Sequence, residues 1–88
     1  MVGKSSGTHE LPFGLALRRL RLAAGMSQER LGLEAGVQRN FISLIELGQN
    51  QPTINTISRL ARALGMPASV LVAEAESEAR SKQLRRKK

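Results

Sequence analysis

Residues 27–48, SQERLGLEAGVQRNFISLIELG, decide the fold of this chain. Apolar residues three or four positions apart occur in both halves of the segment, as Leu31, Ala35, Ile42 and Ile45. This spacing places each pair on one face of an α-helix. Gly36 lies between the halves and allows a sharp reversal of the backbone. We therefore predict two short helices joined by a tight turn, the first capped by Ser27 and the second beginning near Gln38.

The helical pattern continues on both sides of this segment. A first helix is predicted from the apolar face of Phe13, Leu17, Leu20 and Ala24. Pro52 and Thr53 open a fourth, with a stripe of Ile54, Ile57, Leu60, Ala61 and Leu64. Pro67 suits the start of a fifth, which we expect to run to about Glu78. Left-handed C-caps are expected at Gly25, Gly36, Gly48 and Gly65. We predict an all-α fold of five helices whose apolar stripes form the core.

The basic residues are concentrated at the C-terminal end. The 88 residues include 14 Lys and Arg against 7 acids, a formal charge of +7. Residues 80–88 hold six of these bases and no acid, so the preceding chain carries only +1. We predict a disordered leader at residues 1–11, a helical domain at residues 12–78 and a basic tail at residues 79–88.

The sequence lacks side chain types that most active sites need. The chain has no cysteine and no aspartate, and its single histidine, His9, lies in the predicted leader. Catalytic triads, thiol nucleophiles and Cys- or His-based metal sites are therefore not expected. No apolar run approaches the roughly 20 residues that span a bilayer, and no signal-peptide core is present. We expect a cytoplasmic protein that is not an enzyme and uses no metal or cofactor, with nucleic acid as its leading partner.

Two short helices joined at a glycine form the helix-turn-helix arrangement, which presents its second helix to the DNA major groove. The segments LRRLRLAAGMSQERL and AGVQRNFISLIELGQNQPTINTISRLARALGMPASVL resemble the lambda-repressor/Cro-type, or xenobiotic-response-element-type, helix-turn-helix regulators. The matching pattern covers about three-quarters of the chain. The resemblance implies a compact lambda-repressor-like domain that binds double-stranded DNA.

In this family, the N-terminal and outward residues of the second of these two helices contact base edges. If Ile42 and Ile45 point inward, the helical projection turns four residues outward: Asn40, Ser43, Leu44 and Leu47. The resemblance implies base contacts by Gln38, Arg39, Asn40, Ser43 and Leu44. Arginine suits guanine, Gln and Asn suit adenine, and leucine meets only a thymine methyl or a sugar. Leu47 is expected to pack beneath the following loop.

The resemblance also implies contacts to the DNA backbone. Gln28 matches the family glutamine that hydrogen-bonds a phosphate and braces the recognition helix, and Ser27 lies beside it. The alternative for these two residues is an N-cap and an exposed side chain. In relatives the polar loop at residues 49–53 lies along the backbone, so Asn50 and Thr53 are predicted phosphate contacts.

Arg21 and Glu46 are predicted to serve the architecture. Each projects about 40° from a core residue, Leu17 and Ile42 respectively, and a lone charge at such a position would be costly. In the family these two positions form an ion pair that ties the first helix to the recognition helix.

The fifth helix carries an apolar run that one face cannot bury. With Leu71 inward, Val70 or Val72 is left outward, which predicts a dimer contact. A single exposed valine is the alternative. A two-fold dimer would set two recognition helices about 34 Å apart, matching a palindromic operator.

These inferences converge on a homodimeric transcriptional regulator, a repressor or controller, that binds a palindromic operator. Two alternatives remain: an antitoxin that also binds its own operator, and a protein-interaction module that keeps the same fold. A protein partner is left open, and no membrane is expected. RNA binding has weaker support, because only Phe13 and Phe41 could stack on bases. The basic tail could tether DNA, aid solubility or dock a protein, and we favour the tether.

Overall fold

The computed structural model describes the backbone of residues 11–86 and the side chains of residues 11–81. Residues 1–10 of the predicted leader, with His9, and residues 87–88 of the predicted tail lie outside the described residues. Within the described range every element is an α-helix: α1 Phe13–Ala23, α2 Gln28–Ala35, α3 Arg39–Glu46, α4 Ile54–Ala63 and α5 Ala68–Arg86. The predicted all-α fold of five helices is confirmed.

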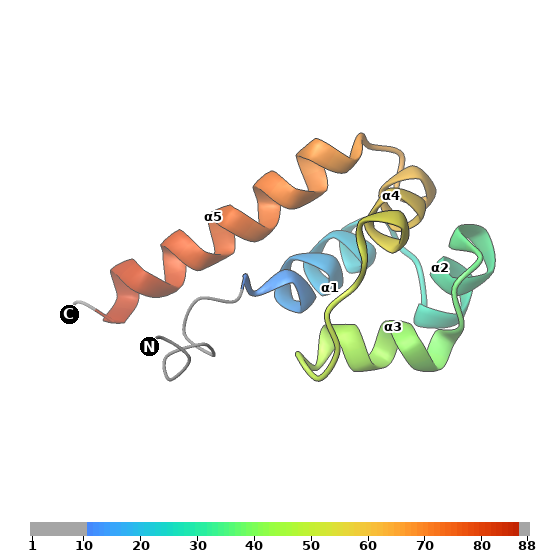
Figure 1. The fold of residues 1–88 in the computed structure, drawn as a ribbon, viewed down its shortest axis with the longest axis horizontal. Helices are drawn as coiled ribbons and strands as arrows, with labels where there is room; N and C mark the ends of the chain where they lie inside the picture. The colour runs from blue at the N-terminus through green and yellow to red at the C-terminus, as the bar shows by residue number, and fades with distance from the viewer. Residues whose placement is uncertain (1–10, 87–88) are drawn as a thin grey trace.

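Each of the five helices packs against two others. Helix α1 lies between α5 and α3, while α2 packs against α3 and α4, and α4 against α5 (Figure 1). The core between them consists of aliphatic side chains that are almost wholly buried: Leu17, Leu31, Ile42, Ile45, Leu60 and Leu71. Burying a side chain of this size contributes about 1.5–3 kcal/mol. Helices as short as α2 and α3 are not stable alone, so this packing holds them in place.

The helix ends follow the predicted capping residues. Ser27 Oγ accepts a hydrogen bond from the Arg30 N–H at 2.9 Å, and Thr53 Oγ1 accepts one from the Thr56 N–H at 3.2 Å. The four glycines predicted to end helices all have positive φ, between 71° and 78°. A residue in this left-handed conformation reverses the chain, so that backbone N–H groups after the helix can hydrogen-bond to carbonyl groups that the helix end leaves unsatisfied.

Helix α5 is longer than predicted, because it continues to Arg86 and does not stop near Glu78. The residues after Glu78 contain no glycine or proline and are mostly good helix formers. Cations near a helix C-terminus are also favoured by the helix dipole. The helix is anchored on α1, where Arg19 binds Glu74 at 2.8 Å and Glu78 at 2.9 Å, next to the fully buried Ala75. The predicted boundary between domain and tail therefore falls inside a continuous helix.

Two residues that were predicted to lie on apolar helix faces are outside the core. Ala24 is the exposed C-cap of α1, and Ile54, the first residue of α4, is 80% exposed. Both lie at helix ends, where the apolar face extends beyond the neighbouring helices. The projection of a helix gives the direction of a side chain but not whether another element covers it.

Two glycines inside helices bring backbones into direct contact. A Cβ on Gly14 of α1 would overlap the Ile45 carbonyl oxygen of α3 and lie 2.9 Å from Glu46 Cα. A Cβ on Gly32 of α2 would lie 2.6 Å from the Val37 carbonyl oxygen, in the turn that leads into α3. Glycine costs about 1 kcal/mol in a helix, so this close approach is what favours it here. Together the two contacts fix the path of α3.

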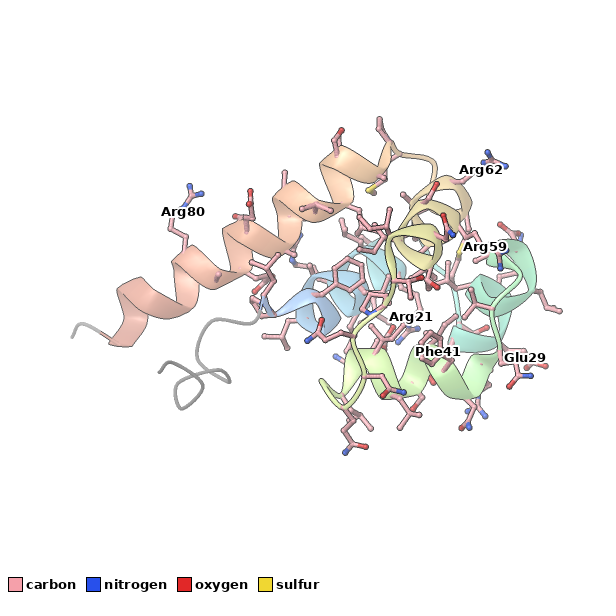
Figure 2. The ribbon with its side chains drawn as sticks, viewed as in Figure 1. Arg21, Glu29, Phe41, Arg59, Arg62 and Arg80 are labelled. Carbon is pink, nitrogen blue, oxygen red and sulfur yellow. The ribbon has the colours of Figure 1, made fainter. Side chains whose placement is uncertain are left out.

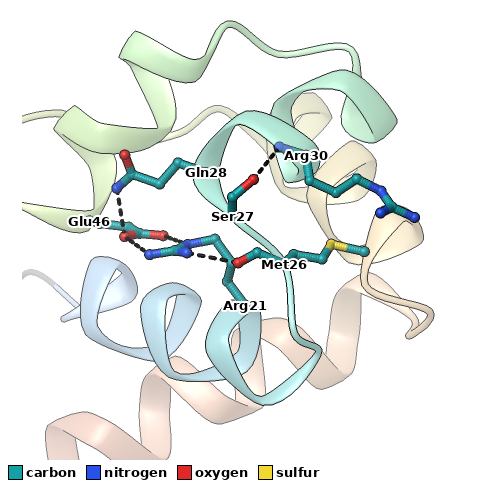
Figure 3. A network of polar contacts seen from close by, with 6 residues as sticks. All are labelled: Arg21, Met26, Ser27, Gln28, Arg30 and Glu46. Carbon is teal, nitrogen blue, oxygen red and sulfur yellow. Dashed lines mark hydrogen bonds and ion pairs between the residues drawn. The ribbon is translucent and has the colours of Figure 1, made fainter.

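A buried ion pair joins α1 to the C-terminal end of α3 (Figure 3). Arg21 Nε and Nη2 donate to the two carboxylate oxygens of Glu46 at 2.7 and 3.0 Å, and the two side chains are 8% and 3% exposed. Arg21 Nη1 also donates to the Met26 carbonyl oxygen at 2.9 Å. The hydrogen bond to Glu46 raises the pKa of Arg21 above its ordinary value. The stabilising contribution of the Arg21 charge is therefore complete at neutral pH and is lost as the pH rises into strong alkali.

The contact at Gly14 predicts that Gly14→Ala destabilises the domain by about 1–3 kcal/mol, because the methyl group forces α1 away from α3. Leu15→Ala is the matched control, since Leu15 is the next residue of α1 and is 46% exposed. Urea unfolding followed by circular dichroism measures both variants. If Gly14→Ala were as stable as the wild type, the close approach of these helices would not constrain the fold.

The buried ion pair predicts that Glu46→Gln costs about 3–5 kcal/mol, because it leaves the Arg21 guanidinium buried without a counter-charge. Glu74→Gln is the control: it removes a carboxylate from Arg19, whose side chain is 48% exposed, and should cost no more than about 1 kcal/mol. The free energies of unfolding are compared at low temperature, where the weaker variant retains structure. Equal losses for the two variants would contradict the assigned role of the pair.

Candidate nucleic-acid interface

The helix-turn-helix consists of α2 and α3 joined at Gly36, which has a left-handed backbone with φ of 71°. Leu31 of α2 and Ile42 and Ile45 of α3 are buried in the core. The rigid turn and the shared core hold the two helices at one angle. The opposite side of α3 is left to solvent, which is the geometry that a major-groove helix needs.

The N-terminal end of α3 presents three consecutive polar side chains. Gln38, Arg39 and Asn40 are all exposed. Gln38 occupies the N-cap position, but its side chain makes no capping hydrogen bond. Within residues 11–81 none of the three side chains is hydrogen-bonded or ion-paired. Their donors and acceptors are therefore free to meet an external partner.

The other two predicted base contacts lie further along α3 and are less open. Ser43 and Leu44 are half-buried, so each presents only part of its side chain to solvent. Leu47 was predicted to pack beneath the following loop, and this is wrong: it is the C-cap of α3 and is 67% exposed. The loop turns away at Gly48, whose φ is 78°, and leaves Leu47 uncovered. The exposed side of α3 thus combines polar groups at its N-terminal end with an apolar side chain at its C-terminal end.

The residues predicted to contact phosphate border α3 on two sides. At the start of α2, Gln28 Nε2 donates to Glu46 Oε1 at 3.0 Å, beside the capping Ser27 (Figure 3). An amide nitrogen has two hydrogens, so the second N–H of Gln28 remains for another acceptor. The structure thus ties Gln28 to the same carboxylate that Arg21 binds.

On the other side, Asn50 is exposed in the loop between α3 and α4. Thr53 is engaged within α4: its hydroxyl caps the Thr56 N–H and contacts the Thr56 hydroxyl at 3.1 Å. Any phosphate at this end would therefore meet the first backbone N–H groups of α4 more readily than the Thr53 hydroxyl.

The predicted dimer contact lies at the start of α5. Val70 is 41% exposed and Val72 is half-buried, while Leu71 between them is fully buried against the domain. Val70 is therefore the more open of the two predicted residues.

Other kinds of site find less support in the described part of the chain. Phe13 is 4% exposed and Phe41 packs partly against the core, so little aromatic surface is left for stacking on RNA bases. Among the described residues no group of His, Cys, Asp or Glu side chains could hold a metal ion. No described helix has the length and apolar character needed to cross a membrane.

Sequence reasoning missed the two glycines that allow close backbone contact and the ion pairs that join α1 to α5. Gly14 and Gly32 lie at interior helical positions, where a glycine signals close backbone approach, and that signal was present in the sequence. The contact of Arg19 with Glu74 and Glu78 joins residues 55 and 59 positions apart, and spacing on a single helix carries no sign of it.

The chain is similar to known regulators over the region just described. A family model described as helix-turn-helix matches residues 17–71. Control protein C.BamHI of Bacillus amyloliquefaciens is 39% identical over 57 residues, which are 64% of this chain and 70% of that protein. The phage transcriptional repressor RstR of Vibrio cholerae is 31% identical over 65 residues, which are 74% of this chain and 59% of that repressor.

The similarity extends to a solved structure. The restriction–modification controller protein C.AhdI of Aeromonas hydrophila is 38% identical and superposes with a TM-score of 0.67, over 69% of this chain and 92% of that one. The region that the family model matches, residues 17–71, contains α2, the turn, α3 and α4, with most of α1 and the start of α5. The chain belongs to the helix-turn-helix family.

Proposed function

We propose that this chain is a non-enzymatic regulator that binds double-stranded DNA with α3 in the major groove and so controls transcription. The observation that carries the proposal is the set of three exposed, unengaged polar side chains, Gln38, Arg39 and Asn40, on a helix that a buried ion pair holds in place. The names of the related control protein, controller protein and transcriptional repressor support this role.

The chemistry of these side chains suits base recognition. Arg39 can donate two parallel hydrogen bonds to guanine, and the amides of Gln38 and Asn40 can each pair with adenine. Further along the helix, the partly exposed Leu44 suits a thymine methyl group and Ser43 either kind of base edge. Gln28, Ser27 and the N-terminus of α4 flank this surface and suit phosphates, which set the register on the duplex.

We propose further that the protein acts as a two-fold homodimer through the start of α5. Val70 supplies an exposed apolar contact there, and a domain this small gains stability by covering it. Two copies of α3 about 34 Å apart would read the two halves of a palindromic operator.

The proposal predicts that Arg39→Ala weakens binding to the preferred duplex by about tenfold to a hundredfold, or about 1–3 kcal/mol, and relaxes the preference at one base step. The duplex is first selected by the wild-type protein from a random pool, and fluorescence anisotropy then measures affinity at two salt concentrations. Arg18→Ala is the control, because Arg18 is an exposed arginine of α1 and is not part of the recognition helix α3. Sequence-blind binding by the wild type, with equal losses for the two variants, would refute base reading by α3.

The dimer proposal predicts that Val70→Glu shifts the protein to a monomer at micromolar concentration, because two like charges would meet across the two-fold axis. Leu15→Glu is a matched control: both residues are the third of their helices, and their exposed fractions are 46% for Leu15 and 41% for Val70. Sedimentation equilibrium gives the mass of each variant. A wild-type monomer, or a Val70→Glu dimer as stable as the wild type, would rule out this interface.

A further inference from the structure

A groove between α2 and α4 lies outside the proposed base-reading surface of α3. Its volume is about 700 Å³, and it is lined by the C-terminal half of α2 and the outer face of α4: Leu33, Glu34, Ala35, Gly36, Asn55, Ser58, Arg59 and Arg62. None of these residues belongs to α3 or to the N-terminal end of α2. Figure 2 shows Arg59 and Arg62 projecting from α4 on the side of the molecule where α2 lies, and far from Arg80 of α5.

The groove presents positive charge without an internal partner. Among the described side chains, no carboxylate lies within ion-pair distance of Arg59 or Arg62. The acid in the groove, Glu34, is already bound by Arg30 at 2.6 Å. Two unpaired guanidiniums therefore face an opening whose own carboxylate is neutralised, and an acidic ligand would complement them.

The two helices that form the groove also carry exposed large apolar side chains. Leu33 lines the groove and is 77% exposed, and Ile54, one turn before Ser58 on α4, is 80% exposed. Single exposed leucines are ordinary on a protein surface. Here, however, an exposed aliphatic side chain lies on each of the two helices that form the groove. The combination suits a ligand that has both carboxylates and an apolar side chain.

We propose that this groove binds an acidic segment of a protein partner, with a large apolar residue against Leu33 and flanking carboxylates on Arg59 and Arg62. A DNA backbone would satisfy the arginines, but it has no large apolar group to cover Leu33. The groove is also formed by other residues than the base-reading surface of α3. The partner site therefore does not depend on the proposed reading of bases by α3.

Phage-displayed random dodecapeptides provide the probe. Panning on the wild-type protein should enrich peptides that carry Asp or Glu on both sides of a Leu, Ile, Met or Phe. A synthetic peptide of the most enriched sequence is then titrated by anisotropy. The double variant Arg59→Gln/Arg62→Gln and the single variant Leu33→Gln should each bind it at least tenfold more weakly. The double variant Arg18→Gln/Arg80→Gln removes two exposed arginines outside the groove and should bind within about twofold of wild type.

Three results with peptides would overturn the proposal: enrichment without acidic residues, equal losses for the groove and control variants, or no effect of Leu33→Gln. The selected DNA duplex is titrated with the same proteins. If Arg59→Gln/Arg62→Gln weakens DNA binding tenfold and leaves peptide binding intact, the groove is a phosphate site and the proposal fails. Failure of Arg39→Ala to change base preference, with peptide binding still lost in the groove variants, would reject only the DNA role of α3.

Discussion

The position of the recognition helix depends on one carboxylate, that of Glu46. Helix α3 has only eight residues, and a helix of that length has little stability of its own. Glu46 is its last residue, where the helix dipole disfavours negative charge, so the position needs a cation. Arg21 of α1 supplies that cation with two hydrogen bonds, and Gln28 of α2 adds a third to the same carboxylate. One side chain thus joins three helices and sets the exposed face of α3 relative to the start of α2.

This arrangement fixes the relative positions of the two kinds of contact that a DNA-binding domain needs, those to phosphates and those to bases. Gln28 is placed by Glu46 at one end of α3, and Arg39 is placed by the turn at the other end. Gly14 and Gly32 add to this because they let α1 and the turn approach α3 at backbone distance. With so little separation between backbones, α3 has no room to rotate or slide. A small core is therefore enough to hold α3, because close backbone contact limits the movement of this helix in addition to the burial of its apolar side chains.

Much of this architecture could be predicted from the sequence, because the signals are local. Apolar spacing located the helices, and Ser27 and the helix-ending glycines marked their boundaries. The projection of Arg21 and Glu46 onto the core edge pointed to a need for a partner, and the structure brings the two together. The exposure of Leu47 and Ile54 could not be predicted, because it depends on whether a distant element covers the side chain. The groove between α2 and α4 escaped prediction for the same reason: it exists only where two separate helices meet.

The distribution of charged side chains shows why the formal net charge says little about the surface of this domain. The chain before residue 80 has a formal charge of only +1, a value that by itself would describe a neutral surface. In the structure, however, most of the described carboxylates are bound internally, to Arg19, Arg21 and Arg30. Three of these acids join separate helices and Glu34 pairs within α2, while other arginines, among them Arg39 and Arg59, face solvent on different surfaces. A nearly neutral domain can therefore present separate basic surfaces, and where the acids are paired matters more than how many there are.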